Sequence, residues 1–206
     1  MNQSVGGVDV SRETIARLEL YSQLVTKWTP KINLIARSSI TEIWNRHIID
    51  SAQLYRFAPD SYGKWVDLGS GAGFPGIVMA IIAIEKQPGA EFVLIESDQR
   101  KATFLRTAAR EIGLKVSVLA DRIENLPQQT ADIVSARALT SLSGLLALSE
   151  RHIARDGVCL FHKGKQAEQE LAEARAGWRF ALEDHASLTD PEARLLAIQR
   201  IEKRGK

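Results

Sequence analysis

The sequence predicts a doubly wound α/β fold: a mostly parallel, seven-stranded sheet with N-terminal helices and an antiparallel last strand. From Lys64 onward, short runs of apolar residues alternate with helical segments. These runs are continuously apolar, as expected when helices cover both faces of a parallel sheet. Near the end of the chain two apolar runs follow each other with no helix between them. Because a parallel pair needs a crossover, we expect this last pair to be antiparallel.

Length and composition describe an ordinary globular protein. The chain has 206 residues and a net charge of +2, which permits an anionic partner such as nucleic acid without requiring one. A single cysteine, Cys159, excludes an internal disulfide and a cysteine-based zinc cage, and its apolar neighbours predict a buried position. His152, His162 and His185 show no metal-ligand spacing, so we expect no metal site. Without a leader-like N-terminus or about 20 consecutive apolar residues, the expected location is cytoplasmic, with no membrane contact.

Residues 1–60 are predicted to form a helical extension packed on the core. Ser11 is a good N-cap for a first helix, and Pro30 is expected at its end. A second helix is expected to begin near Ser39. Apolar residues of the first helix recur at steps of three and four: Ile15, Leu18, Tyr21, Leu24, Val25 and Trp28. A turn-rich stretch at 58–64 separates this part from a cofactor-binding domain at 61–206.

The predicted domain alternates strands and helices. The expected strands cover residues 65–68, 92–96, 116–120, 132–137, 158–163, 178–184 and 194–203. The expected helices cover residues 76–85, 99–112, 141–153 and 165–175. Gly113 is a typical helix stop, so the end of the second of these helices is well defined.

A glycine-rich loop, VDLGSGAGFPG, follows the first strand of the domain. Asp67, Gly69, Gly71 and Gly73 form the pattern D-x-G-x-G-x-G, in which glycine lets the backbone turn sharply and approach a ligand closely. Ligands of open α/β sheets bind beyond the carboxyl ends of the strands, and Glu96 ends the second strand, where a carboxylate can accept hydrogen bonds from ribose hydroxyls. The loop is therefore predicted to bind the nucleoside part of a cofactor.

Two cofactors fit the glycine spacing. Gly71, Gly73 and Gly76 also satisfy G-x-G-x-x-G, the dinucleotide fingerprint. Asp67 favours S-adenosylmethionine, because a carboxylate would repel a pyrophosphate and would suit the cationic methionine end. The antiparallel ending favours the same cofactor by analogy of fold, since it is typical of class I methyltransferases with a Rossmann-like domain.

Five segments, in this order, carry a resemblance to a known family. They are WNRHIIDS at 44–51, VDLGSGAGFPG at 66–76, LIESDQRKATFLR at 94–106, SARALTSL at 135–142 and HKGK at 162–165. Together they resemble the bacterial RsmG (GidB) family of 16S rRNA methyltransferases, from about residue 20 to the end of the chain. The resemblance implies methylation of N7 of a guanosine, guanosine 527 in the decoding-region loop. The partner it implies is 16S rRNA or the small ribosomal subunit.

The resemblance also implies cofactor contacts at Gly69, Phe74, Ile123, Glu124 and Arg137. We expect Phe74 to pack on apolar parts of the cofactor, Ile123 to cover one adenine face, and Glu124 or the Ile123 backbone to bind the adenine edge. Arg137 ends a strand and can hold the methionine carboxylate, an RNA phosphate or a structural carboxylate.

No dedicated catalytic residue is expected, because N7 of guanine carries an available lone pair and catalysis then rests on positioning. Arg46, His47 and Asp50 share one helical face and, with Lys163, are candidates for binding the guanine or RNA. Asp50 could stabilise positive charge on the methylated guanine; an internal salt-bridge cluster is the alternative for this group. Further candidates for phosphate contact are Arg37, Arg100, Lys101, Lys165 and the tail RIEKRGK at 200–206.

Three other functions fit parts of these patterns. A methyltransferase acting on another substrate would keep the same cofactor half. A nicotinamide-dependent oxidoreductase would use the second glycine fingerprint. A non-catalytic module could keep the fold and only bind RNA or a ribosomal partner.

Overall fold

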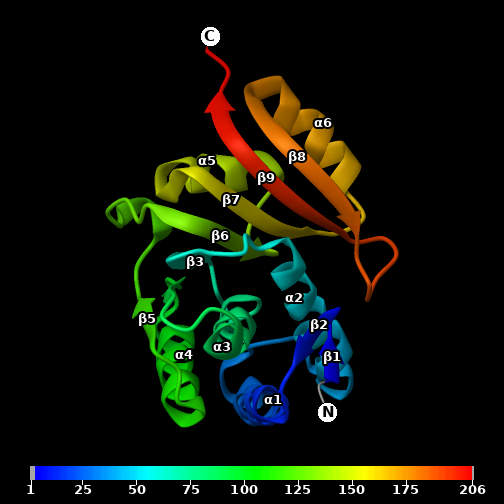
Figure 1. Ribbon diagram of the computed structural model, residues 1–206, viewed down its shortest axis with the longest axis vertical. Helices are drawn as coiled ribbons and strands as arrows, with labels where there is room; N and C mark the ends of the chain where they lie inside the picture. Colours follow the sequence, from blue (N-terminus) through cyan, green and yellow to red (C-terminus); the bar gives the residue numbers. More distant parts are fainter. Residues whose placement is uncertain (1–2, 206) are drawn as a thin grey trace.

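A computed structural model describes residues 3–205, in which a seven-stranded sheet forms the centre (Figure 1). The strand order is β5-β4-β3-β6-β7-β9-β8. β9 runs antiparallel to both β7 and β8, while β3 to β7 pair in parallel. The predicted fold class is therefore confirmed, including the antiparallel last strand. The strands are β3 (Lys64–Leu68), β4 (Glu91–Ile95), β5 (Val116–Leu119), β6 (Ala131–Arg137), β7 (Ile153–Lys163), β8 (Trp178–Ala186) and β9 (Arg194–Lys203).

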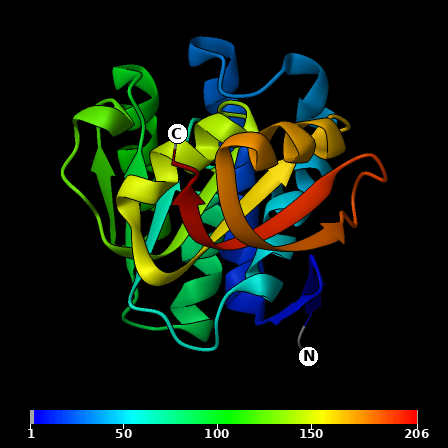
Figure 2. The same ribbon diagram turned by 90° about the horizontal axis from the view of Figure 1, so that it is seen from above.

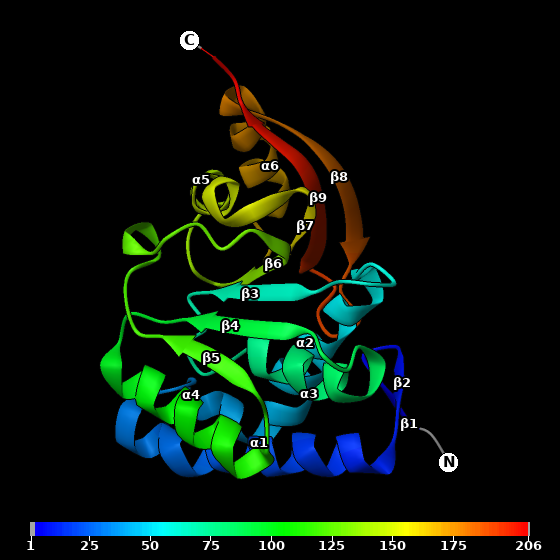
Figure 3. The same cartoon turned by 60° about the vertical axis from the view of Figure 1, so that its left-hand side comes forward.

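Helices cover both faces of the sheet, as the continuously apolar strands predict. On one face lie α5 (Leu142–His152) and α6 (Ala167–Gly177), which lie side by side in Figure 2. The other face carries α1 (Arg12–Ile32), α3 (Gly76–Lys86) and α4 (Gln99–Ile112), and Figure 3 shows the two layers from the side. Each face has its own buried apolar cluster, so the sheet separates two cores.

The first helix begins as predicted and ends later than predicted. The Ser11 side chain accepts a hydrogen bond from Thr14 N at 3.2 Å and caps the helix. The helix does not stop at Pro30 but continues to Ile32. Pro30 lies in the last turn, and Asn33, in the left-handed region at φ 53°, ends the helix by donating its backbone N–H to Thr29 O. A left-handed residue, not the proline ring, therefore ends this helix.

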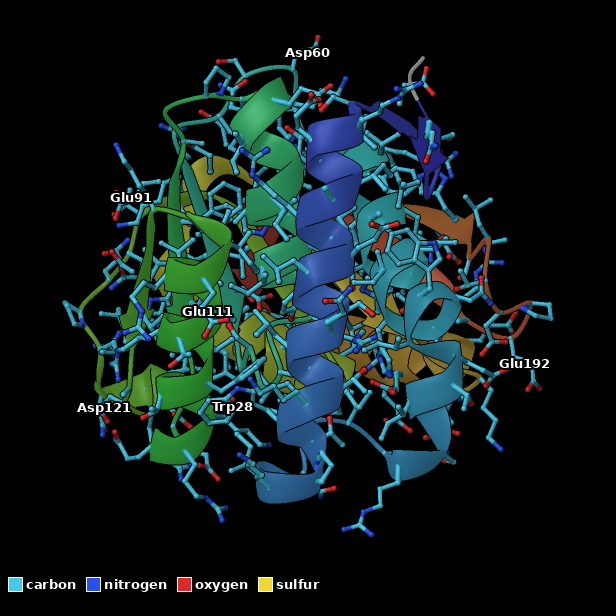
Figure 4. All side chains as sticks on the ribbon, turned by 90° about the horizontal axis from the view of Figure 1, so that it is seen from below. Trp28, Asp60, Glu91, Glu111, Asp121 and Glu192 are labelled. Carbon is cyan, nitrogen blue, oxygen red and sulfur yellow. The ribbon has the colours of Figure 1, made fainter. Side chains whose placement is uncertain are left out.

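A second regular helix after residue 39 is not formed. Residues 37–57 instead make four short segments: 3₁₀ helix η1 (Arg37–Glu42), π-helix η2 (Trp44–Ile49), α2 (Asp50–Ala52) and 3₁₀ helix η3 (Gln53–Phe57). Side chains and carbonyls of this stretch bond to the sheet and to the β8–β9 loop, and these tertiary bonds compete with regular winding. Figure 4 shows α1 crossing this side of the molecule between α4 and these segments.

The chain starts with a hairpin that the sequence prediction does not contain. β1 (Gln3–Val5) and β2 (Val8–Val10) pair antiparallel around Gly6 and Gly7, both at positive φ. Gly6 also lies against the backbone of the helical segment, because an added Cβ would stand 2.5 Å from Gln53 N. The two glycines are an ordinary signal for a two-residue hairpin turn.

Within residues 3–205, three features bear on the expectations from composition: the position of the cysteine, the length of the helices and the clustering of metal-binding side chains. Cys159 is buried, and burial raises the pKa of its thiol to about 12, as the apolar run predicts. None of the described helices is both long and apolar enough to cross a membrane. Among the same residues, no cluster of three or more histidine, cysteine, aspartate or glutamate side chains is arranged to hold a metal ion.

Candidate functional site

The loop between β3 and α3 has the conformation that its glycines predict. Gly69, Gly71 and Gly73 have φ values of 63°, 56° and 92°, in the left-handed region that favours glycine. At Gly69 an added Cβ would also stand 2.6 Å from the Leu139 side chain. The fold therefore brings the loop backbone within contact distance of its neighbours, as a ligand-cradling loop requires.

Glu96 lies beneath this loop, held at both carboxylate oxygens. Oε2 accepts a hydrogen bond from Gly71 N and Oε1 accepts one from Asp98 N, each at 2.7 Å. Each oxygen keeps a further lone pair, because a carboxylate can accept about four hydrogen bonds. Glu96 is thus an oriented acceptor, the geometry needed to bind a pair of hydroxyl groups.

A cavity of about 760 Å³ opens beside the glycine loop at the carboxyl ends of the strands. Seven residues that the sequence assigned to the cofactor line this one cavity: Gly69, Gly71, Phe74, Glu96, Ile123, Glu124 and Arg137. They come from four separate stretches of chain, which only the parallel sheet brings together. Ile123 and Glu124 lie on a short 3₁₀ helix, η4 (Ile123–Asn125), directly after β5.

Sequence reasoning missed part of the apolar wall of this cavity. Leu34 and Ile35 come from the turn after α1, Leu139 from the loop after β6 and Leu148 from α5. Leu34 and Ile35 directly follow the left-handed cap of α1, but nothing local in the sequence indicates that this turn folds back over the cavity. These four side chains make the cavity suitable for a ligand with a flat apolar part.

Asp67 does not have the position that the sequence argument gave it. Its side chain is 1% exposed and does not line the cavity. Oδ1 accepts a hydrogen bond from Ser135 Oγ at 2.6 Å, and Ser135 Oγ accepts one from Trp65 Nε1 at 2.8 Å. Burial raises the pKa of Asp67 to about 6, against the opposing hydrogen bonds. The expected contact with the cationic methionine end is therefore wrong, because Asp67 braces the sheet under the loop.

Arg137, at the end of β6, connects the sheet to the N-terminal segment. Its Nη1 donates to Asp50 Oδ2 at 3.1 Å and to the Arg46 carbonyl at 3.2 Å, and its Nη2 lies 2.8 Å from His47 Nδ1. The guanidinium also lies over the Phe74 ring, 5.2 Å from its centre. The salt-bridge alternative for these residues is thus present, although Arg137 still lines the cavity.

His47 is held as a neutral ring with a defined proton. Because Nδ1 faces the always-protonated Arg137, it must accept, so the ring proton lies on Nε2. Burial and the neighbouring Arg137 lower the pKa of His47 to about 4. The ring stacks on Phe74 at 4.9 Å. Nε2 is buried and has no hydrogen-bond partner within the part of the chain that the structure describes.

A second cavity, of about 880 Å³, adjoins the first, and the two share Arg137 and Ala138 as lining residues. Its wall includes the four residues that the sequence proposed for guanine or RNA: Arg46, His47, Asp50 and Lys163. The predicted grouping of these residues is therefore seen in the structure.

Besides His47, two of the four residues are already engaged within the protein. Asp50 Oδ1 accepts hydrogen bonds from Gln53 Nε2 at 2.9 Å and Thr189 Oγ1 at 2.8 Å, in addition to the Arg137 bond at Oδ2. Lys163, only 9% exposed, lies 2.6 Å from Glu170 Oε2 and 3.0 Å from the carbonyl of Thr140. The Lys163–Thr140 bond fixes the loop after β6. Arg46 is exposed, and among the described residues its side chain pairs with Glu42.

The basic tail is not on the same edge of the sheet as the cavities. In β9, Arg194 pairs with Lys163 at the cavity edge, and Lys203 pairs with Trp178 at the opposite edge. The described part of this tail, a predicted phosphate contact, therefore lies at the far edge of the sheet from the cavities; residue 206 lies outside the described residues. Of the other basic candidates, Lys101 lines the first cavity and Lys165 the second, while Arg100 pairs with Asp98.

Comparison with known proteins identifies the family. A family model described as rRNA small subunit methyltransferase G matches residues 14–195. The chain belongs to this family. A ribosomal RNA small subunit methyltransferase G of Cereibacter sphaeroides is 55% identical over 94% of the chain and 93% of the relative. The protein of the same name from Ruegeria pomeroyi is 50% identical over 94% of the chain and 95% of the relative.

Solved structures share the fold at low sequence identity. A SAM-dependent methyltransferase from Aquifex aeolicus has a TM-score of 0.59 and 15% identity, covering 80% of the chain and 97% of that structure. TYW2 of M. jannaschii, solved in complex with AdoMet, has a TM-score of 0.58 and 14% identity, covering 85% and 80%. The fold of this rRNA small subunit methyltransferase G family member is thus the Rossmann-like fold of class I methyltransferases.

Proposed function

We propose that this protein uses S-adenosylmethionine to methylate N7 of a guanosine in 16S rRNA, guanosine 527, and acts in the cytoplasm. One observation carries the proposal: two cavities share Arg137 and Ala138 in their walls, and the first is lined by seven residues that the sequence assigned to the cofactor. Membership of the rRNA small subunit methyltransferase G family supports the RNA substrate. The substrate is then ribosomal RNA, alone or in the small subunit.

The first cavity fits an adenosyl ligand. An added Cβ at Gly71 would meet no atom closer than 3.8 Å, so the space beside this backbone is left open for a ligand. Glu96 would hold the ribose hydroxyls, and Ile123 with the other apolar wall residues would cover the adenine. S-adenosylmethionine, when bound, supplies a methyl group made electrophilic by a positively charged sulfur. Leu34, Ile35 and Leu139 would exclude water from that group.

The second cavity is the place for the target guanosine, since a base must leave its stack to enter a pocket. Here the protein has to hold N7 in line with the methyl group and needs no general base, because N7 carries no proton. His47 lines this cavity with its protonated Nε2 buried, so the exposed Arg46 is the residue available to bind the nucleotide. Asp50 is not, because its carboxylate already accepts bonds from Arg137, Gln53 and Thr189.

Calorimetry and RNA mapping test the two halves of this proposal. We expect the purified protein to bind S-adenosylmethionine and not NAD, because the glycine spacing alone is compatible with both. In cells lacking the protein, we expect N7-methylguanosine to disappear from one position of 16S rRNA. Binding of NAD alone would support an oxidoreductase, and binding of neither would support a non-catalytic module. An unchanged rRNA pattern with retained cofactor binding would leave a methyltransferase of another substrate.

A further inference from the structure

Tyr21, in the middle of α1, contacts the glycine loop from below. Its side chain is completely buried, and its hydroxyl donates a hydrogen bond to the carbonyl of Ala72 at 2.5 Å. Ala72 lies between Gly71 and Gly73, so the bond reaches the part of the loop that turns toward the cavity. Burial raises the pKa of Tyr21 well above its usual value, so the hydroxyl keeps the proton that it donates.

The close approach of Tyr21 also limits which residue can occupy position 73 of the loop. An added Cβ at Gly73 would stand 2.6 Å from the Tyr21 hydroxyl, so glycine is needed there for the helix to approach. The Tyr21 ring packs against Phe74, with ring centres 5.2 Å apart. Tyr21 thus contacts three consecutive residues, Ala72 to Phe74, and two of them line the cofactor cavity.

The same helix leads directly into the cavity wall. α1 ends at Ile32, and the next turn places Leu34 and Ile35 in the wall of the first cavity. Both side chains are buried and belong to the apolar cluster that contains Tyr21. Residues 1–60 therefore contribute to this cavity twice, through a hydrogen bond beneath the loop and through apolar side chains in the wall.

We propose that Tyr21 is a positioning residue for the cofactor loop, and that the N-terminal helical extension thereby completes the cofactor site. The proposal rests on the proposed function, since it takes the first cavity as the S-adenosylmethionine site. Without the hydroxyl, the Ala72 carbonyl would be buried with no donor from Tyr21, and the loop would gain other conformations. Only a fraction of the molecules would then have the cavity-forming conformation, and the apparent affinity for the cofactor would fall by that fraction.

The test is Tyr21→Phe, with Tyr62→Phe as a matched control. Tyr62 is also a buried tyrosine, and within residues 3–205 its hydroxyl bonds to Tyr55 Oη, at 3.0 Å, outside both cavities. By calorimetry we expect Tyr21→Phe to weaken S-adenosylmethionine binding about fivefold and Tyr62→Phe to leave it unchanged. Hydrogen exchange of the 69–76 backbone should become faster in Tyr21→Phe alone. In turnover assays, KM for the cofactor should rise more than kcat falls.

Three outcomes can be told apart. Equal cofactor affinity in Tyr21→Phe and the unaltered protein would overturn the proposal. Equal weakening in both variants would also overturn it, because it would show a general loss of stability. Failure of the unaltered protein to bind S-adenosylmethionine would instead contradict the proposed function. If Tyr21→Phe folds only at low temperature, the exchange and binding measurements are made there on all three proteins.

Discussion

Arg137 and Asp50 form an ion pair of 3.1 Å that joins the end of β6 to the N-terminal segment, with side chains 18% and 14% exposed. The pair lies at the boundary of the two cavities. Removing one partner of such a pair leaves the other charge in a poorly hydrated place, which costs more than an exposed pair contributes. The same pair therefore shapes both cavities and contributes to stability.

We expect Asp50→Asn to lower the free energy of unfolding by about 2 kcal/mol, because Arg137 loses its countercharge. Asp184→Asn is the control, since Asp184 forms a 2.7 Å pair with Arg194 whose side chains are 29% and 35% exposed. There the loss should be below about 1 kcal/mol. Urea unfolding of the three proteins measures both values. If both variants lost the same free energy of unfolding, the Arg137–Asp50 pair would contribute no more than an exposed pair.

A methyl group at Gly71 should block the cofactor cavity. At φ 56° alanine is strained, and its Cβ would stand free of protein atoms beside the cavity. Gly113→Ala carries similar strain at φ 78°, at the end of α4, with no atom within 4 Å of the added Cβ and outside both cavities. Both variants should lose about 1 kcal/mol of stability. Only Gly71→Ala should lose calorimetric binding of S-adenosylmethionine; unchanged binding would mean that the ligand lies elsewhere.

The stability contributed by His47 should depend on pH. Its pKa is lowered from 6.5 to about 4 by burial and by Arg137, so the unfolded chain binds the proton more tightly than the folded one. The contribution is therefore complete above pH 6.5 and is lost as the pH falls toward 4. The difference in unfolding free energy between the unaltered protein and His47→Gln should grow with pH over this range and then level off. Other histidines cancel in the comparison, and a difference independent of pH would contradict this account.

RNA contacts should be restricted to the cavity edge of the sheet. Lys165 lines the second cavity, while Lys203 lies at the opposite edge. We expect Lys165→Ala to weaken binding of 16S rRNA fragments and to lower the slope of log affinity against log salt by about one unit. Lys203→Ala should bind as the unaltered protein does. Filter binding at several salt concentrations measures both, and equal losses would place the RNA on another surface.

Local signals were sufficient for many elements of this fold. α4 covers Gln99–Ile112 as predicted, because Asp98 caps its first turn and Gly113 adopts the left-handed conformation after its end. The glycine loop and Glu96 were likewise predictable, because the loop follows directly after one apolar strand and Glu96 directly follows the next strand in the sequence. Local reasoning was insufficient at residues 37–57, where Gln53 and Asp50 bond to a loop more than 130 residues away and regular helix gives way to short segments.

Local sequence determines some features of the glycine loop and its surroundings, and tertiary packing determines the others. The sequence by itself determined the sheet, its antiparallel ending, the loop and seven of the residues that line the first cavity, because each depends on neighbouring residues or on the common edge of parallel strands. Only the tertiary structure decided that Asp67 braces the sheet, that Tyr21 supports the loop and that Arg137 pairs with Asp50. These contacts join residues 51 to 87 positions apart, and their partners are selected by packing, which no local pattern encodes.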